Sequence, residues 1–343
     1  MKAKSILQVL LSHVSHYDSI LPYNLNWLKR DWRAICPFLS EHPLYVVDIG
    51  ARGGTMDEMK PLQRFINYLA FDADATEASR MQSQLGQGFK SARVFPYFVG
   101  ASSGTQTFHL FDEPGCSSAL LPNPRFLPFA GPGFWVKRSV EVESRTLDSV
   151  VEKYQVEDID VIKLDTQGTE YAILEASPNA LSKALLVEVE VEFFEMYANQ
   201  KLFADICQLM RESGFDLLYL NRVFMSRQAY RGKTRGQILF GDVLFGRRDD
   251  RASQLPIEKK LKYIILLIQY GHMDFAQKLY SEDSDVQALV PEIGRYFEYY
   301  GDSLWGKFKR FSAMQLDKII LMLLHARQTN HRGCDSDRSW PIR

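Results

Sequence analysis

The stretch YVVDIGARGG, residues 45–54, decides the fold. Its apolar run ends at Asp48, and the length of that run between turn residues predicts a buried strand. Gly50 then opens a glycine-rich turn, in which the backbone can approach a ligand without a Cβ in the way. Residues 56–65 follow with helical spacing. We therefore predict a strand, a glycine loop and a helix, with a nucleotide-type site at the carboxyl end of a first parallel strand.

Strand and helix patterns alternate from residue 44 to about residue 248, which predicts a parallel α/β sheet. The expected strands of this sheet are residues 44–49, 67–72, 92–99, 160–165, 184–193, 214–220 and 236–247, of which the last two form a hairpin-like pair. Two additional strands, 105–111 and 139–145, flank a proline-rich segment at 112–138. A long segment of this kind inside a compact domain is usually functional, and its aromatic residues argue against disorder. We interpret it as an ordered flap that faces the substrate.

Helical patterns flank this region on both sides. Residues 1–40 are expected to form an N-terminal helical segment that serves as a scaffold or as a lid. The main domain is then 41–250, including the flap at 112–138. Residues 251–343 are expected to form a helical appendage with a polar tail, and its amphipathic helices offer a surface for homo-oligomer formation. Within it, the basic and aromatic segment 295–311 is interpreted as helix core with solvated charges rather than as a membrane-surface helix.

Bulk properties exclude several classes of protein. The chain has 343 residues and a net charge of -1, which argues against a general nucleic-acid binder. Its four cysteines are scattered without metal-binding spacing, which indicates free thiols in a reducing, cytoplasmic compartment. No apolar run approaches the roughly 20 residues that span a bilayer. The N-terminus favours an amphipathic helix over a signal peptide, because no small-residue cleavage site follows its short apolar run.

The glycine loop does not fit a nicotinamide or flavin enzyme. That fingerprint, G-x-G-x-x-G, needs its second glycine next to the pyrophosphate. Arg52 stands at that position, where its side chain would crowd a pyrophosphate, and the next glycines are Gly53 and Gly54. Asp72 follows about 20 residues beyond the loop, where a carboxylate can accept hydrogen bonds from both hydroxyls of a ribose. The pattern therefore favours a ribose-bearing cofactor of another kind.

Two sets of motifs resemble known methyltransferases. VVDIGARGG, with FDAD at 71–74, resembles motif I and its acidic partner in S-adenosylmethionine-dependent methyltransferases. The segment at 145–177, RTLDSVVEKYQVEDIDVIKLDTQGTEYAILEAS, resembles the FkbM family, whose pattern is T-L-D, then a strand ending in K-x-D, then G-x-E. The matching residues are Thr146-Leu147-Asp148, Lys163-Leu164-Asp165, and Gly168 with Glu170. The resemblance covers roughly residues 44–248.

The resemblance implies a fold, a cofactor and a class of acceptor. The fold is a doubly wound, mostly parallel, seven-stranded Rossmann-like methyltransferase sheet, with N-terminal helices and a C-terminal helical appendage. The cofactor is S-adenosylmethionine, and the acceptor is a hydroxyl of a sugar, glycan or natural product, because members of this family are mostly O-methyltransferases. Asp72 would bind the ribose hydroxyls, and Gly100 would lie near the adenine. The residues expected at the cofactor are Asp48, Gly50, Ala51, Arg52, Gly53, Asp72, Ala73, Gly100, Asp165 and Thr166.

Charged residues on two central strands point to the reaction site. The central strands of a doubly wound sheet are covered on both faces and should be apolar. Lys163 and Asp165 nevertheless lie on one such strand, and Glu188, Glu190 and Glu192 alternate with valines on the next. A departure from an otherwise consistent pattern points to a functional site. The alternative is a buried ion pair of Lys163 with a glutamate, or a strand that has one exposed face.

Four residues are candidates for the base that activates a hydroxyl nucleophile. We rank Asp165 first, then Glu190 or Glu188, then His109, for which a structural role is at least as consistent. Asp165 with one of these glutamates could instead hold a divalent cation that acidifies the hydroxyl. The sequence does not separate a base from a metal, and no spacing assigns a metal ligand.

Two other functions compete with sugar O-methylation. One is methyl transfer to a small molecule that is not a carbohydrate. The other is a non-catalytic module that keeps the fold and binds a partner through its C-terminal helices. The presence of Asp48, Gly50, Asp72 and Asp165 argues against the non-catalytic module.

Overall fold

The computed structural model describes residues 35–52, 57–85, 88–232, 234, 236–302 and 334–336. Three predicted features lie outside these residues: Gly53, the N-terminal helical segment up to residue 34, and most of the appendage from residue 303 onward. The chain divides into two compact units. One is Pro43–Gln254 with Arg332–Cys334, and the other is Met1–His42 with Leu255–His331 and Asp335–Arg343.

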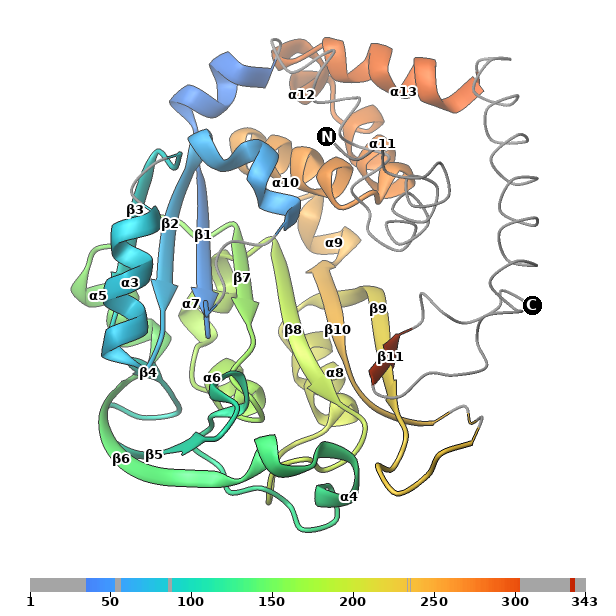
Figure 1. The fold of residues 1–343 in the computed structure, drawn as a ribbon. Helices are drawn as coiled ribbons and strands as arrows, with labels where there is room; N and C mark the ends of the chain where they lie inside the picture. The colour runs from blue at the N-terminus through green and yellow to red at the C-terminus, as the bar shows by residue number, and fades with distance from the viewer. Residues whose placement is uncertain are drawn as a thin grey trace, which may run out of the picture. The chain divides into compact units, whose positions relative to one another are not determined.

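A mostly parallel sheet forms the centre of the first unit (Figure 1). Its strands are β1 (Leu44–Ile49), β2 (Ile66–Phe71), β3 (Ser91–Phe95), β7 (Val161–Leu164), β8 (Leu186–Glu192), β9 (Phe215–Met225), β10 (Gln237–Arg247) and β11 (Cys334–Ser336). Within the described residues they follow the order β11-β9-β10-β8-β7-β1-β2-β3. The strands from β8 to β3 in this order pair in parallel, whereas β10 runs antiparallel to β8 and to β9. The predicted doubly wound sheet of seven strands is confirmed, and β11 joins its edge.

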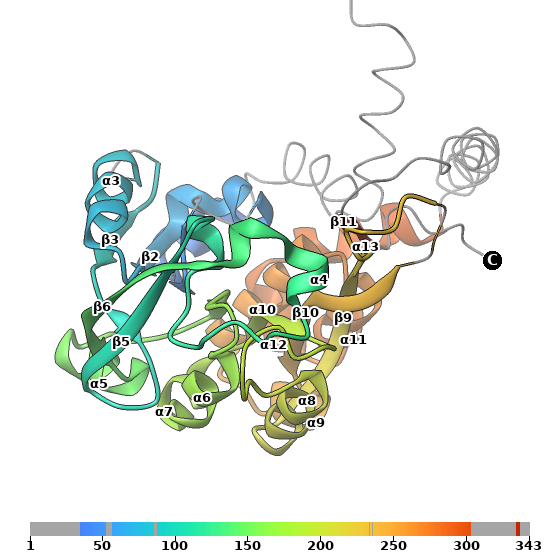
Figure 2. The ribbon, with the colours of Figure 1, turned by 60° about the horizontal axis from the view of Figure 1, so that its bottom comes forward.

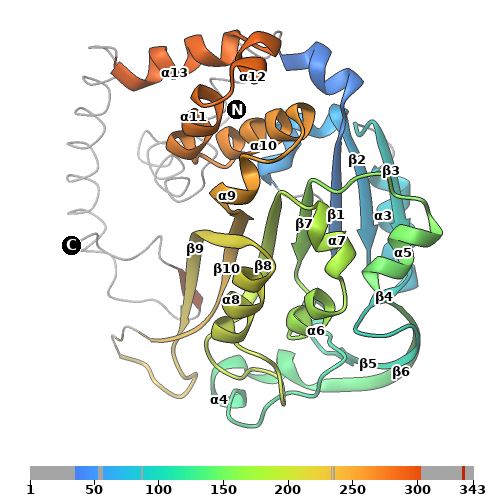
Figure 3. The same ribbon diagram turned by 180° about the vertical axis from the view of Figure 1, so that it is seen from behind.

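Four helices cover one face of this sheet, as Figure 3 shows. They are α5 (Leu147–Lys153), α6 (Glu170–Glu175), α7 (Pro178–Lys183) and α8 (Phe203–Glu212). The alternating valines of β8 are buried against them in the main hydrophobic core. Helix α7 is an addition to the predicted elements. Pro178 begins it, because proline is tolerated in the first turn, where its missing N–H would have no partner within the helix.

A second sheet contains three strands of the described chain in the order β4-β6-β5, and Figure 2 shows β5 and β6 side by side. These strands are β4 (Phe98–Val99), β5 (Gly104–Phe111) and β6 (Val136–Arg145). The sequence predicted a single strand at 92–99, and this prediction was wrong. Pro96 lies between β3 and β4 and has no N–H to donate to a strand ladder, so the chain leaves the main sheet there and β4 joins the second sheet.

Residues 112–138, the segment interpreted as a flap, contain three short helical turns: η2 (Pro114–Cys116), α4 (Leu127–Ala130) and η3 (Pro132–Phe134). Their aromatic side chains pack with residues that follow β8 in a second core. The members of this core are Phe111, Phe126, Phe129, Phe134, Met196, Tyr197 and Leu239. Apolar packing therefore holds this segment, despite its prolines, next to the chain that leaves β8.

The remaining described elements are helical. In the first unit they are η1 (Asp57–Phe65), α3 (Ala75–Leu85) and α9 (Asp249–Ala252). In the second unit, residues 35–41 are helical, and α10 (Ile257–Gln269), α11 (Met273–Ser281), α12 (Ser284–Leu289) and α13 (Glu292–Asp302) follow one another. Within that unit, Lys260 of α10 forms an ion pair with Asp283, which also caps α12. None of the described helices is long and apolar enough to cross a membrane.

Candidate active site

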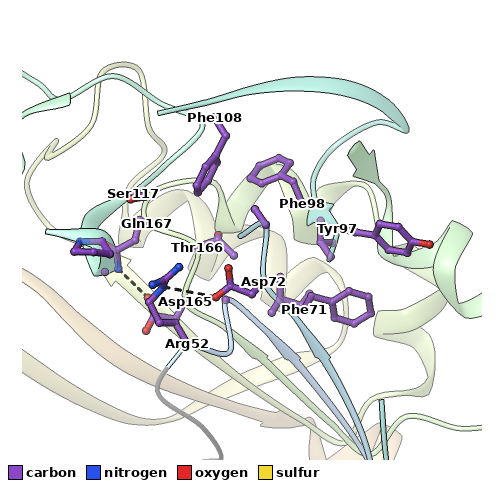
Figure 4. Close-up of a pocket in the computed structure, with 16 residues that line it drawn as sticks. Arg52, Phe71, Asp72, Tyr97, Phe98, Phe108, Ser117, Asp165, Thr166 and Gln167 are labelled. Carbon is purple, nitrogen blue, oxygen red and sulfur yellow. Dashed lines mark hydrogen bonds and ion pairs between the residues drawn. The ribbon is translucent and has the colours of Figure 1, made fainter. Parts of the chain in front are cut away.

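A pocket opens at the carboxyl ends of β1, β2 and β7, under β4, β5 and η2 (Figure 4). Its lining residues are Ile49, Gly50, Arg52, Phe71, Asp72, Ala73, Tyr97, Phe98, Val99, Phe108, Pro114, Gly115, Ser117, Asp165, Thr166 and Gln167. The empty space in this pocket, part of it open to solvent, is about 730 Å³. The glycine loop, the second-strand aspartate and the K-x-D aspartate thus border one cavity.

Gly50 lets the ends of β1 and β7 meet. Its φ is +77°, and its N–H and that of Ala51 both donate to the carbonyl of Phe71, at 3.0 and 3.1 Å. A Cβ at Gly50 would lie only 1.9 Å from the carbonyl oxygen of Asp165. Asp165 in turn donates its N–H to the carbonyl of Ile49 at 3.0 Å. The glycine is therefore required for the contact that places Asp165 at the pocket.

Asp72 offers a carboxylate to the pocket from the end of β2. It is 8% exposed, and its Oδ1 accepts a hydrogen bond from the N–H of Asp74 at 2.8 Å. Arg52 lies between the two aspartates, with Nε 3.6 Å from Asp72 Oδ2 and Nη2 3.2 Å from Asp74 Oδ2. Burial raises the pKa of Asp72, while the Asp74 N–H and Arg52 act in the opposite direction. Asp72 Oδ2 is thus only loosely paired, so it can accept a hydroxyl from a ligand.

Aromatic side chains form one wall of the pocket. Phe71, Tyr97, Phe98 and Phe108 line it from the ends of β2 and β3 and from the second sheet. The Tyr97 hydroxyl lies 3.0 Å from that of Tyr154. Such a wall suits a flat ring system. Gly100 is absent from the lining but lies behind it, because a Cβ there would be 2.7 Å from the Phe98 ring.

Asp48 lies beneath the pocket and does not line it. It is fully buried, accepts a hydrogen bond from the hydroxyl of Tyr68, and has its Oδ1 3.6 Å from Lys163 Nζ. Lys163 also lies 3.9 Å from Asp165 Oδ2. Burial raises the pKa of Asp48, and Lys163 and Tyr68 oppose that shift. Burial would lower the pKa of Lys163, but the surrounding carboxylates, Asp48 first, raise it above its ordinary value. The ion pair that the sequence left open with a glutamate thus forms chiefly with Asp48 and Asp165.

Carboxyl groups gather on the other side of Asp165. The amide of Gln167 donates to Asp165 Oδ1 at 2.8 Å and to Glu190 Oε2 at 2.7 Å. Burial, and then Asp165, raise the pKa of Glu190 well above its ordinary value. Glu170 is buried nearby and accepts hydrogen bonds from the N–H groups of Thr166 and Gly168. Burial raises the pKa of Glu170 to about 7, although these hydrogen bonds oppose the shift.

Three of the four candidate bases are absent from the pocket lining, and of these Glu190 is linked to it through the Gln167 amide. Glu188 stands opposite Lys163 in the register of β8 with β7. His109 lies on β5 with its Nδ1 2.8 Å from the hydroxyl of Ser139, and its neighbour Phe108 lines the pocket instead. Among the described residues, no group of three or more His, Cys, Asp or Glu side chains is arranged to hold a metal ion. The divalent-cation alternative therefore finds no ligand set in that part of the chain.

The structure adds residues that the sequence did not single out. Gln167 lines the pocket and bridges two carboxylates, and Tyr197 donates to the Gln167 side-chain oxygen at 2.7 Å. The only sequence signal for Gln167 was its place before Gly168 in the D-x-x-G turn. Tyr197 had no signal, because it lies 30 residues away along the chain.

Comparison with known proteins agrees with this geometry. Residues 49–217 match the model of the methyltransferase FkbM domain. These residues are an FkbM methyltransferase domain. It is a methyltransferase that depends on S-adenosylmethionine. The 2-O-methyltransferase NoeI of Sinorhizobium fredii is 24% identical over 191 residues, which are 52% of this chain and 75% of that protein.

Solved methyltransferase structures are more distant from this chain. Magnesium protoporphyrin IX methyltransferase of Synechocystis PCC 6803, with bound S-adenosylmethionine, is 13% identical at a TM-score of 0.31, covering 72% of this chain and 86% of that one. The 1,6-didemethyltoxoflavin N1-methyltransferase of Burkholderia thailandensis is 12% identical, also at 0.31, covering 73% and 94%. Likenesses at such TM-scores add no argument, and the fold assignment rests on the strand order itself.

Proposed function

We propose that this methyltransferase transfers the methyl group of S-adenosylmethionine to a hydroxyl of a sugar, glycan or glycosylated metabolite. The observation that carries the proposal is the position of Asp165. It borders the same cavity as Gly50 and Asp72, and Gln167 joins it to Glu190. The similarity to a 2-O-methyltransferase supports oxygen as the atom that is methylated.

The described residues fit the cofactor. Asp72 Oδ1 and Oδ2 can accept the two hydroxyls of a ribose, since a carboxylate accepts in two directions. The wall of Phe71, Tyr97 and Phe98 is suited to stack on or pack against an adenine. The remaining residues that we assign to the cofactor or to its support are Asp48, Gly50, Ala51, Arg52, Gly53, Ala73, Gly100 and Thr166. S-adenosylmethionine, when bound, supplies an activated methyl group that already carries its leaving group.

The chain's own contribution is to align the acceptor hydroxyl and to remove its proton. Asp165 is the first candidate base, because its side chain is 41% exposed and lines the pocket. Lys163 and Gln167 fix its two oxygens. Glu190, which the Gln167 amide links to Asp165, is the second candidate.

Methyl incorporation from tritiated S-adenosylmethionine tests the proposal. The acceptors are a panel of methyl glycosides of hexoses and deoxyhexoses, with catechol as a hydroxyl compound that is not a carbohydrate. We expect incorporation into at least one glycoside. Asp165→Asn should lower kcat by about 10²–10⁴-fold, while binding of S-adenosylmethionine stays measurable. Asp72→Asn should instead weaken cofactor binding by about tenfold, the loss of one charged hydrogen bond.

The outcomes separate the parts of the proposal. Methylation of catechol without methylation of any glycoside would show that the acceptor is a hydroxyl compound that is not a carbohydrate. Full activity of Asp165→Asn would remove Asp165 from the reaction. Failure of the wild-type protein to bind S-adenosylmethionine, measured by calorimetry, would overturn the assignment of the pocket to the cofactor.

A further inference from the structure

Gln167 holds a backbone conformation that side chains rarely adopt. Its φ is +59°, and Gly168 follows at +101°. Among the described residues only Gln155 and Asn199 share a positive φ without being glycine. A left-handed residue that is not glycine is strained, and such strain often persists where function requires it. Gln167 lines the pocket from the turn that follows β7 (Figure 4).

The hydrogen bonds of Gln167 fix the orientation of its amide. The two amide hydrogens are donated to Asp165 Oδ1 and to Glu190 Oε2, at 2.8 and 2.7 Å. Ionised carboxylates only accept, so the nitrogen must face them and the oxygen must face Tyr197. The Tyr197 hydroxyl lies 2.7 Å from that oxygen and 2.9 Å from the carbonyl oxygen of Cys116, and its one hydrogen is shared between these two acceptors. The backbone carbonyl of Gln167 accepts from the hydroxyl of Ser118 at 2.7 Å, which ties the turn to segment 112–138.

We propose that Gln167 is a positioning residue for methyl transfer, whose amide holds the carboxylates of Asp165 and Glu190 side by side while Tyr197 locks the amide. This inference rests on the proposed function of Asp165. Two carboxylates this close repel each other, and the amide relieves the repulsion by donating to both. Lys163 approaches the other oxygen of Asp165, at 3.9 Å, so each oxygen of that carboxylate has a separate partner.

The Gln167 amide also affects how the neighbouring carboxyl groups bind protons. A hydrogen bond donated to an ionised carboxylate favours the ionised form. Removal of the Gln167 amide should therefore raise the pKa of Glu190 further above its ordinary value. Other ionisable groups also act on Asp165 and Glu190, from β1, β7, β8, β10, α6 and η2, and they stay unchanged in the test. They are Asp48, Lys163, Glu188, Glu192, Asp242, Glu170 and Cys116.

The test variant is Gln167→Asn, with Gln155→Asn as its matched control. Asparagine tolerates a positive φ and keeps the amide, but its side chain is one methylene too short to reach both carboxylates. Gln155 has a φ of +50° and is exposed, so its replacement changes the same chemical group on the same kind of backbone outside the pocket. Tyr197→Phe is the second variant: it keeps the buried ring and removes only the hydroxyl that orients the amide.

The readout is the Kd of S-adenosylmethionine measured by calorimetry from about pH 4.5 to about pH 7, where the amino group of the ligand stays protonated. In the wild-type protein the Kd should increase as pH falls, because protonation of Glu190 removes negative charge from the site of the cationic sulfonium. Gln167→Asn should move this inflection up by about one pH unit, equal to a tenfold change in proton affinity. Tyr197→Phe should move it in the same direction by less, and Gln155→Asn should leave it in place.

Three other results would contradict the positioning role of Gln167. A uniform loss of affinity in Gln167→Asn, without movement of the inflection, would mean a merely structural role. A wild-type profile without an inflection would mean that Glu190 does not face the cofactor. If the wild-type protein binds no S-adenosylmethionine, the proposed function fails and this inference fails with it. Thermal unfolding shows whether each variant is folded. If Gln167→Asn is not folded, the shift of the inflection in Tyr197→Phe tests the positioning role.

Discussion

Single buried carboxyl groups determine much of the pH dependence that we expect in the free energy of unfolding of this protein. Glu192 is 1% exposed at the end of β8, and neither of its oxygens has a hydrogen-bond partner among the described residues. Burial, followed by Glu170, raises its pKa well above 4.5. The folded protein therefore binds a proton that the unfolded chain releases. This contribution to stability is full below a pH of about 4.5 and is lost as pH rises through the raised pKa.

Glu192→Gln should remove the loss of stability that occurs as pH rises, because glutamine has the shape of glutamate and carries no ionisable proton. We expect the free energy of unfolding at neutral pH to increase by about 1 kcal/mol, and its decline between acidic and neutral pH to become shallower. Urea unfolding at a series of pH values measures both quantities. An equal decline in the variant and in the wild-type protein would show that Glu192 is ionised in the folded state.

The same substitution at Glu170 should have the opposite effect. Glu170 accepts from the N–H groups of Thr166 and Gly168, so an amide nitrogen there would face donors. Glu170→Gln should lower the free energy of unfolding by about 1–3 kcal/mol at acidic pH. With a pKa of about 7, Glu170 contributes its full stability below about pH 4.5, and this contribution is lost as pH rises through 7. The difference between variant and wild type in urea unfolding should therefore shrink toward higher pH, and a constant difference would contradict the assigned pKa.

Sequence alone predicts some pocket residues and not others. Gly50, Asp72 and Asp165 were predicted because motif spacing and the ends of parallel strands place them at one edge of a sheet. Gln167 was missed, since its role depends on a left-handed backbone and on a tyrosine that only the tertiary fold brings close. Glu188 and Glu190 alternate on the same strand and look alike in sequence, but only Glu190 reaches the Gln167 amide.

At the scale of elements, the meeting of β1 and β7 is the contact on which the pocket depends. A Cβ at Gly50 would meet the carbonyl oxygen of Asp165 at 1.9 Å, so Gly50→Ala must separate the two strand ends. We expect loss of measurable S-adenosylmethionine binding and destabilisation by about 3 kcal/mol or more. Calorimetry and urea unfolding measure the two effects.

Gly104→Ala is the matched control for that substitution. Gly104 begins β5 with a φ of +144°, but no atom lies within 4 Å of the position that its Cβ would take. Gly104→Ala should therefore lower the free energy of unfolding only by the backbone strain, about 1–2 kcal/mol. The affinity for the cofactor should stay unchanged. Equal effects at the two glycines would mean that strain at positive φ, and not the contact with Asp165, explains the need for glycine.

The elements also show where local patterns stop being informative. Alternating strands and helices predict a parallel sheet, and the strands from β8 to β3 do pair in parallel. The residues at 92–99 read as one apolar run, yet Pro96 divides them between two sheets. The segment at 112–138 has no periodic pattern because its packing comes from aromatic contacts with the chain after β8. Such contacts between distant segments leave no signal in a local window.

For the whole molecule, the two units predict two unfolding events. Every residue that lines the pocket lies between 49 and 167, so the pocket belongs to the unit Pro43–Gln254. We propose that this unit unfolds as a separate cooperative domain. A ligand at 100 times its Kd stabilises the domain that binds it by about 2.7 kcal/mol. In calorimetric scans of the full chain, S-adenosylmethionine should therefore raise the Tm of one transition and leave the other in place. A single transition that shifts as a whole would show that the two units unfold as one.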